Sequence, residues 1–247
     1  MIGSVPRPFL TAEWRWLALL QYEVPDRLVA PLVPRGTELD RWNGRTLVSL
    51  VGFRFLDTRV LGLPIPFHRH FSEVNLRFYV RRRAEEGWRR AVVFIREVVP
   101  RPLIAAVARL AYNEPYRARP MRHSVTMDET GGEVSYEWRE AGQWHRIAAS
   151  TTGLPAPLAE GGEAQFVAEH YWGYTAQRDG GTIEYRVTHP AWRIWQTRSA
   201  SFEGDASANY GPALGEALSG APVSAFVAEG SAVQVFSGQR LSLPQPK

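Results

Sequence analysis

Three polar side chains at alternate positions form the clearest chemical pattern in the chain. Glu73, Asn75 and Arg77 are interleaved with apolar residues in the stretch FSEVNLRFYV, residues 71–80. Alternate side chains of a β-strand point to the same face. A strand here would therefore place a carboxyl, an amide and a guanidinium side by side, as the wall of a polar pocket.

A second polar pair follows in the next apolar stretch. Arg96 and Glu97 come directly after Val92–Ile95, and a short charged turn separates this stretch from the first. Two strands joined by a polar turn predict a hairpin over 71–102. Each carboxyl–arginine pair of this hairpin can equally be a buried structural ion pair, because a buried carboxylate needs a partner to stay charged.

These residue types define the chemistry that we expect of the pocket. Arginine holds a carboxylate through two parallel hydrogen bonds, so a small anionic or carbonyl-containing molecule is the expected ligand and partner. Glu73 and Glu97 are the candidate catalytic residues, since burial raises the pKa of a carboxyl toward the range useful for acid–base chemistry. The candidate ligand-binding residues are Arg77, Arg96, Asn75, Arg117, His189 and Tyr174.

Signatures of metals and cofactors are missing from the sequence. His68 and His70 lie two residues apart in a loop near Glu73, but no H-E-x-x-H pattern is present, and metal sites need further ligands close by. Neither G-x-G-x-x-G nor G-x-x-x-x-G-K-[ST] occurs, and the chain has no cysteine. We expect no metal and no cofactor, although metal binding by His68 and His70 stays an open alternative.

The basic residues are almost all arginine. Lys247, the last residue, is the only lysine, and the formal net charge is +4. The densest basic cluster, Arg81–Arg83, flanks a turn with Glu85 and Glu86, as at a solvated hairpin tip. A nucleic-acid surface carries more like charge and interleaved aromatic residues, so we expect no nucleic-acid partner.

Nothing in the sequence indicates a membrane. Its apolar runs are too short to span a bilayer, and the first residues lack a basic region followed by an apolar core. We therefore expect a cytoplasmic protein with no membrane partner.

The elements that position the polar residues are predicted to be mostly antiparallel strands, from their alternation and turn residues. Asn43-Gly44 is a strong hairpin signal, because both residues tolerate the positive φ of a type I′ turn. The best helix candidate covers 103–112, a long loop covers 56–70, and the loop 151–162 is the only candidate boundary. Because strands flank that boundary, we expect a single α+β domain, mainly antiparallel β with a few short helices, over residues 1–247.

Several motifs resemble the YqjF-like family of uncharacterised conserved bacterial proteins, a domain of unknown function. They are the segment from Pro25 to Phe55, then FSEVNLRFYVR, YNEPYRARPM at 112–121, FVAEHYWGYT at 166–175 and THPAW at 188–192. The resemblance extends over most of the chain. It implies a fold similar to acetoacetate decarboxylase, an antiparallel cone-like barrel with an internal pocket.

The decarboxylase signature has the form R-E-x-x-G-x-P-K, and its lysine forms a Schiff base with the keto acid. Residues 96–103 reproduce the Arg-Glu and, with Pro102, the proline. Pro100 stands at the glycine position and Leu103 at the lysine position. Imine formation needs a primary amine, and a guanidinium does not replace it. We therefore expect no Schiff-base decarboxylase activity.

Three functions remain open at this point. We favour a protein whose internal polar pocket binds a small anionic or carbonyl-containing ligand. The alternatives are a lysine-independent acid–base enzyme (a hydrolase, lyase or isomerase acting on a small organic acid) and a non-catalytic structural or interaction protein. A homo-oligomer is also open, since relatives of the decarboxylase assemble.

Overall fold

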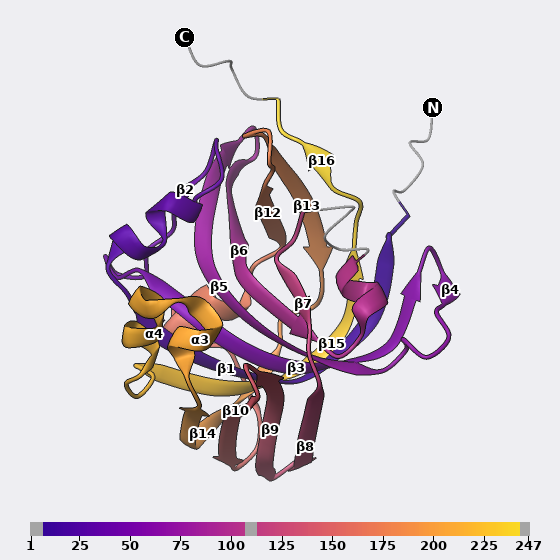
Figure 1. The fold of residues 1–247 in the computed structure, drawn as a ribbon, viewed down its shortest axis with the longest axis vertical. Coiled ribbons are helices and arrows are strands. Elements are labelled where there is room, and N and C mark those ends of the chain that lie inside the picture. Colours follow the sequence, from indigo (N-terminus) through magenta and orange to yellow (C-terminus); the bar gives the residue numbers. More distant parts are fainter. Residues whose placement is uncertain (1–6, 107–112, 243–247) are drawn as a thin grey trace.

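Strands dominate the computed structural model, which describes residues 7–106 and 113–242 (Figure 1). Seven strands of this part of the chain close into a barrel through successive hydrogen-bonded pairs. Around the barrel they are β13 (Thr182–Thr188), β12 (Trp172–Ala176), β6 (Gly87–Val99), β5 (Phe71–Ala84), β3 (Leu47–Val60), β1 (Leu10–Glu23) and β15 (Ser224–Val235).

The barrel closes where β13 meets β15, through the pairs Val187 with Val235 and Thr188 with Gln234. β12 and β6 are parallel, whereas the other neighbouring strands of the barrel are antiparallel. The predicted fold class, mainly antiparallel β with a barrel, is confirmed.

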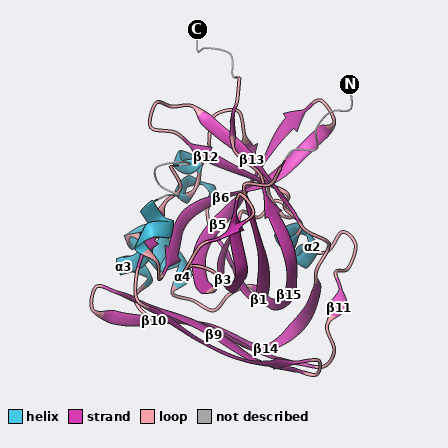
Figure 2. Ribbon diagram, turned by 90° about the vertical axis from the view of Figure 1, so that its right-hand side faces the viewer, coloured by secondary structure: helices cyan, strands magenta, loops and turns pink. Residues whose placement is uncertain are grey.

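A second layer continues from β15 and lies across the outside of β1, β3 and β5 (Figure 2). Its strands, in order, are β14 (Arg193–Glu203), β10 (Gln143–Thr152), β9 (Gly131–Glu140) and β8 (Met121–Asp128). The labelled helices are α2 (Glu163–Ala168), α3 (Ala206–Tyr210) and α4 (Pro212–Leu218), and residues 102–106 are also helical. Short elements complete the fold: β2 (Glu38–Leu39), β4 (Leu63–Pro64), β7 (Tyr116–Ala118), β11 (Ala156–Pro157), β16 (Gln239–Arg240) and the 3₁₀ turns Asp26–Leu28 and Ala30–Leu32.

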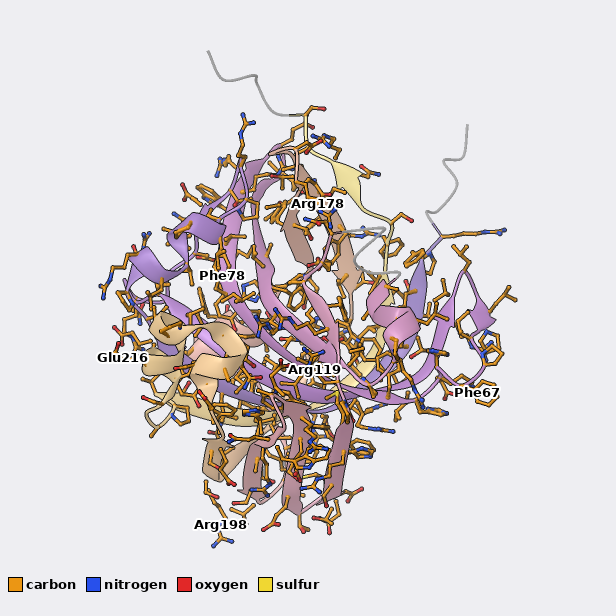
Figure 3. The ribbon with its side chains drawn as sticks, viewed as in Figure 1. Phe67, Phe78, Arg119, Arg178, Arg198 and Glu216 are labelled. Carbon is orange, nitrogen blue, oxygen red and sulfur yellow. The ribbon has the colours of Figure 1, made fainter. Side chains whose placement is uncertain are left out.

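Strand β5 is buried on both faces, and its alternation separates them. Val74, Leu76 and Phe78 belong to the core between the barrel and the second layer; Figure 3 labels Phe78 in the body of the molecule. The intervening polar residues face the interior of the barrel. A strand that is buried on both sides normally carries apolar side chains on both, so the polar row needs a reason of its own.

The two layers approach closely at Gly52 on β3. A Cβ added there would lie 2.5 Å from the ring of Tyr136 on β9, so only glycine leaves room for that ring. The Tyr136 hydroxyl in turn donates to the carbonyl oxygen of Trp16 on β1, at 2.8 Å. This contact holds the second layer against the barrel.

Several predicted elements differ in detail. The predicted helix at 103–112 is helical over 102–106, and its remainder lies outside the described residues. The predicted loop at 56–70 is shorter than expected, because β3 continues to Val60 and β4 pairs back onto it. At the end of this loop Phe67 extends into solvent (Figure 3), with 88 % of its surface exposed. Asn43 and Gly44 form the predicted turn, with φ values of 48° and 81°.

In the part of the chain that the structure describes, helices are too short or too polar to cross a bilayer.

Candidate functional site

The barrel encloses a cavity of about 340 Å³, a size typical of small-molecule sites. Its walls are largely aromatic and aliphatic, and they include Phe9, Trp14, Phe53, Phe55, Phe71, Phe94, Trp172 and Trp192. The polar side chains that line it are Thr58, His68, Glu73, Asn75, Arg77, Glu97, Glu114, Tyr116, His170, Tyr185 and His189. An apolar cavity with a few grouped polar side chains is the usual form of a ligand site.

The polar row of β5 forms one wall of the cavity. Glu73, Asn75 and Arg77 are all buried and all line it, as their alternation predicts. The Asn75 amide donates to Glu73 Oε1 at 3.0 Å, and its own oxygen is buried without a partner among the described residues.

Glu97 and Tyr116 extend this wall from neighbouring strands. Glu97 on β6 pairs with Asn75 of β5, and β7 runs parallel to β6 so that Tyr116 pairs with Glu97. The Tyr116 hydroxyl donates to Glu73 Oε2 at 3.0 Å and also hydrogen-bonds with Glu97. One tyrosine therefore joins two carboxyl groups.

A third carboxyl, that of Glu114, lies on the same side of the cavity. It accepts a hydrogen bond from the Thr175 hydroxyl at 2.5 Å and another from the Tyr185 hydroxyl. Gly173 on β12 makes room for Tyr185, since a Cβ added there would lie 2.2 Å from the tyrosine ring. Neighbouring strands thus hold a donor tyrosine over each end of the carboxyl cluster.

Burial raises the pKa of all three carboxyls. The pKa of Glu73 rises to about 7, although hydrogen bonds from Asn75 and Tyr116 and the charge of Arg77 oppose the rise. Burial likewise raises the pKa of Glu114 to about 7. The pKa of Glu97 is raised well above its ordinary value, because burial is joined by the negative charges of Glu114 and Glu73. At neutral pH this cluster holds protons.

Arg77 is the cationic group of the cavity. Its Nη2 donates to the carbonyl oxygen of Val167 at 3.2 Å, while its Nε is buried without a hydrogen-bond partner. Among the described residues no carboxylate lies within 4.0 Å of the guanidinium. A buried guanidinium that lacks a counter-ion is costly unless something pairs with it.

Two histidines lie on the same side as Arg77. His170 is buried, stacks on Tyr79 at 4.7 Å, and directs Nδ1 to the carbonyl oxygen of Val167. Burial and the charges of Arg90 and Arg77 lower the pKa of His170 well below its ordinary value. His189 stacks on Trp192 at 4.2 Å, and burial lowers its pKa as well. Both rings are therefore neutral at pH 7.

The His170 ring presents an acceptor to the cavity. Since Nδ1 faces a carbonyl oxygen, we assign the proton to Nδ1, which leaves Nε2 with a free lone pair. That Nε2 is buried and has no partner among the described residues. Together with Arg77 it offers one donor and one acceptor to a polar ligand group.

Three of the predicted site residues lie away from the cavity. A bulge in β6 next to Leu76 of β5 leaves Arg96 outside the barrel, 5.7 Å from the Tyr210 ring. Arg117 is exposed and lies 3.8 Å from Glu140. Tyr174 donates to Glu184 at 2.5 Å, in an ion-pair cluster with Arg82.

The two histidines of the long loop, His68 and His70, lie in different surroundings. His68 lines the cavity and directs Nδ1 to the carbonyl oxygen of Pro66 at 2.7 Å, whereas His70 lies 4.0 Å from Asp57. Within residues 7–106 and 113–242 no group of three or more His, Asp or Glu side chains is arranged around a common metal position.

The polar side chains that contact the carboxyl cluster or lie beside Arg77 include four that were not among the predicted site residues: Glu114, Tyr116, His170 and Tyr185. The first two stand in the motif YNEPY and His170 in FVAEHYWGYT. Those motifs were therefore visible as unusual clusters of polar and aromatic residues. Their meeting depends on β7 and β12 pairing in parallel with β6, which local spacing does not reveal.

Leu103, which stands at the signature's lysine position, also lines the cavity, next to Ile104. An apolar side chain thus occupies the part of the wall where the resemblance implies an amine.

The cavity, the barrel and the sequence motifs point to one family. The chain matches the family model DUF2071, described as "Uncharacterized conserved protein", over residues 11–232, and it belongs to that family. The uncharacterized protein YqjF of Bacillus subtilis (strain 168) is 26% identical over 194 residues, which cover 77% of this chain and 75% of that protein. The predicted membership of a YqjF-like family is confirmed.

Solved structures share the fold at low sequence identity. Acetoacetate decarboxylase from Legionella pneumophila has a TM-score of 0.68 at 14% identity, covering 98% of this chain and 90% of that one. An acetoacetate decarboxylase-like enzyme from Sphingomonas wittichii RW1 has a TM-score of 0.63 at 14% identity, covering 94% and 92%. The enduracididine biosynthesis enzyme MppR, complexed with pyruvate, has a TM-score of 0.64 at 13% identity, covering 97% and 92%. The acetoacetate decarboxylase-like fold is therefore confirmed.

Proposed function

We propose that this protein binds a small organic acid that carries a carbonyl group, with the acid's carboxylate on Arg77 and its carbonyl toward the carboxyl cluster. The observation that carries the proposal is the Arg77 guanidinium. It is buried in the cavity wall, and its Nε lacks a hydrogen-bond partner among the described residues. An anionic ligand supplies the missing hydrogen bond and a negative charge in direct contact with the guanidinium.

The rest of the cavity supports a carbonyl group beside the carboxylate. A protonated carboxyl donates a hydrogen bond, and burial together with two neighbouring carboxyls favours the protonated form of Glu97. Its Oε2 is buried without a partner. The carbonyl oxygen of a ligand is a natural acceptor for such a group.

The aromatic walls favour a short apolar body on the ligand. Burial of apolar surface contributes roughly 25 cal/mol per Å², and the cavity volume of about 340 Å³ limits the ligand to a small molecule. Because a relative in fold, MppR, is complexed with pyruvate, 2-oxobutanoate is a suitable probe. It combines a carboxylate, a carbonyl and a short alkyl group.

Binding on this account involves no imine. Leu103 and Ile104 form the cavity wall where the family resemblance implies a lysine, and Lys247 is the only lysine of the chain. The absence of an amine from residues 7–106 and 113–242 supports a protein without Schiff-base decarboxylase activity.

Calorimetric titration of 2-oxobutanoate tests the proposal. We expect binding to the wild type and at least tenfold weaker binding to Arg77→Gln, because a charge-assisted hydrogen bond contributes about 1.5–3 kcal/mol. The matched control is Arg96→Gln, which removes a partly buried arginine from the neighbouring strand outside the barrel and should leave binding unchanged. Equal affinities for wild type and Arg77→Gln would contradict the proposal.

A further inference from the structure

The carboxyl cluster has an arrangement that simple binding does not require. Glu73 and Glu97 are both buried, and the Tyr116 hydroxyl forms hydrogen bonds with both. A hydroxyl has one proton, so it donates to one carboxyl and can only accept from the other. It donates to Glu73 Oε2 at 3.0 Å. Burial and the charges of Glu114 and Glu73 raise the pKa of Glu97 further than its contact with Tyr116 lowers it.

The surroundings of the two carboxyls favour different protonation states. Glu73 accepts hydrogen bonds from Asn75 and Tyr116, and donors of this kind favour the charged form. Glu97 has Tyr116 as its one hydroxyl contact among the described residues, and it faces Glu114 and Glu73. One cavity wall therefore presents a hydrogen-bonded carboxylate beside a protonated carboxyl.

We propose that Glu97 and Glu73 act as an acid–base pair that enolises the carbonyl compound held by Arg77. This inference rests on the proposed function, because it needs the ligand's carboxylate on Arg77 and its carbonyl at Glu97. The atoms that would touch the ligand are the Glu97 Oε2, which is buried in the cavity wall without a partner, and the Glu73 carboxylate two residues from Arg77 on the same strand face.

The proton transfers balance without a further reactant. Glu73 takes a proton from the carbon next to the carbonyl, so that a C–H bond breaks and an O–H bond forms on the carboxylate. The electron pair of the C–H bond moves into a C=C bond, and the carbonyl oxygen takes the proton of Glu97. The product is the enol. Reversal returns a proton to carbon and a proton to Glu97, and neither oxidant nor reductant is involved.

The surroundings of Glu97 and Glu73 suit them to act as general acid and general base. A general acid and a general base work best with pKa values near the working pH, and two carboxyls in one site reach different protonation states when their surroundings differ. Burial raises the pKa of Glu73 to about 7 and raises that of Glu97 well above its ordinary value. The neutral His170 and His189 add no positive charge that would lower them.

Deuterium exchange into 2-oxobutanoate tests the inference. In D₂O, proton NMR follows loss of the C3 methylene signal, with the methyl signal as internal reference. We expect wild-type protein to accelerate this exchange at least tenfold over buffer. Glu97→Gln should lose at least tenfold of the acceleration while binding the acid within about threefold of wild type. The control is Glu137→Gln on β9, a carboxylate outside the cavity, which should exchange like wild type.

Tyr116→Phe provides a second variant that keeps the shape of the site if Glu97→Gln does not fold, and it should also slow exchange. If wild-type protein binds 2-oxobutanoate but exchanges at the buffer rate, or if Glu97→Gln exchanges like wild type, the acid–base pair is wrong while the binding site stands. If calorimetry detects no binding and NMR no exchange, the proposed function fails and the inference fails with it.

Discussion

The side chains that matter most are carboxyls whose surroundings leave them partly protonated. Glu73, Glu97 and Glu114 line one side of a cavity with largely apolar walls, and burial is the largest cause of each raised pKa. In such a place removing the charge is easier than pairing it. The consequence is a site that can donate protons at neutral pH, in a chain without a cysteine and with its only lysine at the last position.

The stability of the fold should therefore depend on pH through Glu114. Its pKa is raised from 4.5 to about 7, so the folded state binds a proton more tightly than the unfolded state does. This contribution is fully present below pH 4.5 and is lost as pH rises toward 7. Glu114→Gln removes this titration, so its stability relative to wild type should increase from pH 4.5 to pH 8 by about 3 kcal/mol.

Denaturant unfolding of wild type and Glu114→Gln at pH 4.5 and at pH 8 measures that gain in stability. The exposed Glu85→Gln is the control, and its difference from wild type should stay the same at both values. A Glu114→Gln difference that does not change with pH would show that this carboxyl is not held in its protonated form.

The strands bring the site together, and their pairing explains how much the sequence could reveal. Period-two alternation on β5 is a local property, and it correctly places Glu73, Asn75 and Arg77 on one face. Arg96 escapes that pattern because a bulge in β6 shifts the register of the hairpin between Leu76 and Arg77. The position of a bulge depends on the pairing of the whole sheet, so the neighbouring residues alone do not predict it.

The residues that were missed come from pairings between distant segments. Glu114 and Tyr116 reach the cavity because β7 lies parallel to β6. Tyr185 reaches it because the hairpin of β12 and β13 joins the barrel where β12 runs parallel to β6. Parallel neighbours need not be close in sequence. The motifs YNEPY and FVAEHYWGYT were visible in the sequence, but their meeting point required the fold.

Gly173 provides a test of how the strands position Tyr185. A Cβ at this position would lie 2.2 Å from the tyrosine ring, so Gly173→Ala must displace that ring or part the strands. Overpacking of this kind costs about 1–3 kcal/mol. Thermal unfolding should show a lower midpoint for Gly173→Ala, whereas Gly220→Ala, where the added Cβ meets nothing within 4 Å, should be neutral. Equal midpoints for the two variants would mean that the ring has room to move.

At the scale of the whole molecule, the barrel forms the cavity and the second layer covers the outside of the barrel. The second layer covers the outer faces of β1, β3 and β5 and buries their apolar side chains (Figure 2). The inner faces are thereby free to carry polar residues around a cavity. The family resemblance predicted the cone-like barrel, since the motifs extend over most of the chain, while alternation and turn residues indicated only a mainly antiparallel β domain.

Composition also carries a prediction for the whole chain. Because Lys247 is the only lysine, borohydride treatment with 2-oxobutanoate should give no reduced adduct in the barrel, as shown by intact and peptide mass spectrometry. Leu103→Lys would place an amine on the cavity wall and should become labelled. An adduct on wild-type protein within residues 7–106 or 113–242 would contradict a mechanism without an imine.

The most direct measurement of the central claim is a crystal structure with 2-oxobutanoate bound. We predict density for the acid inside the barrel, with its carboxylate oxygens about 2.7–2.9 Å from the Arg77 guanidinium and its carbonyl oxygen facing Glu97. An acid that binds outside the barrel, or one that lies in the cavity with its carboxylate away from Arg77, would contradict the account.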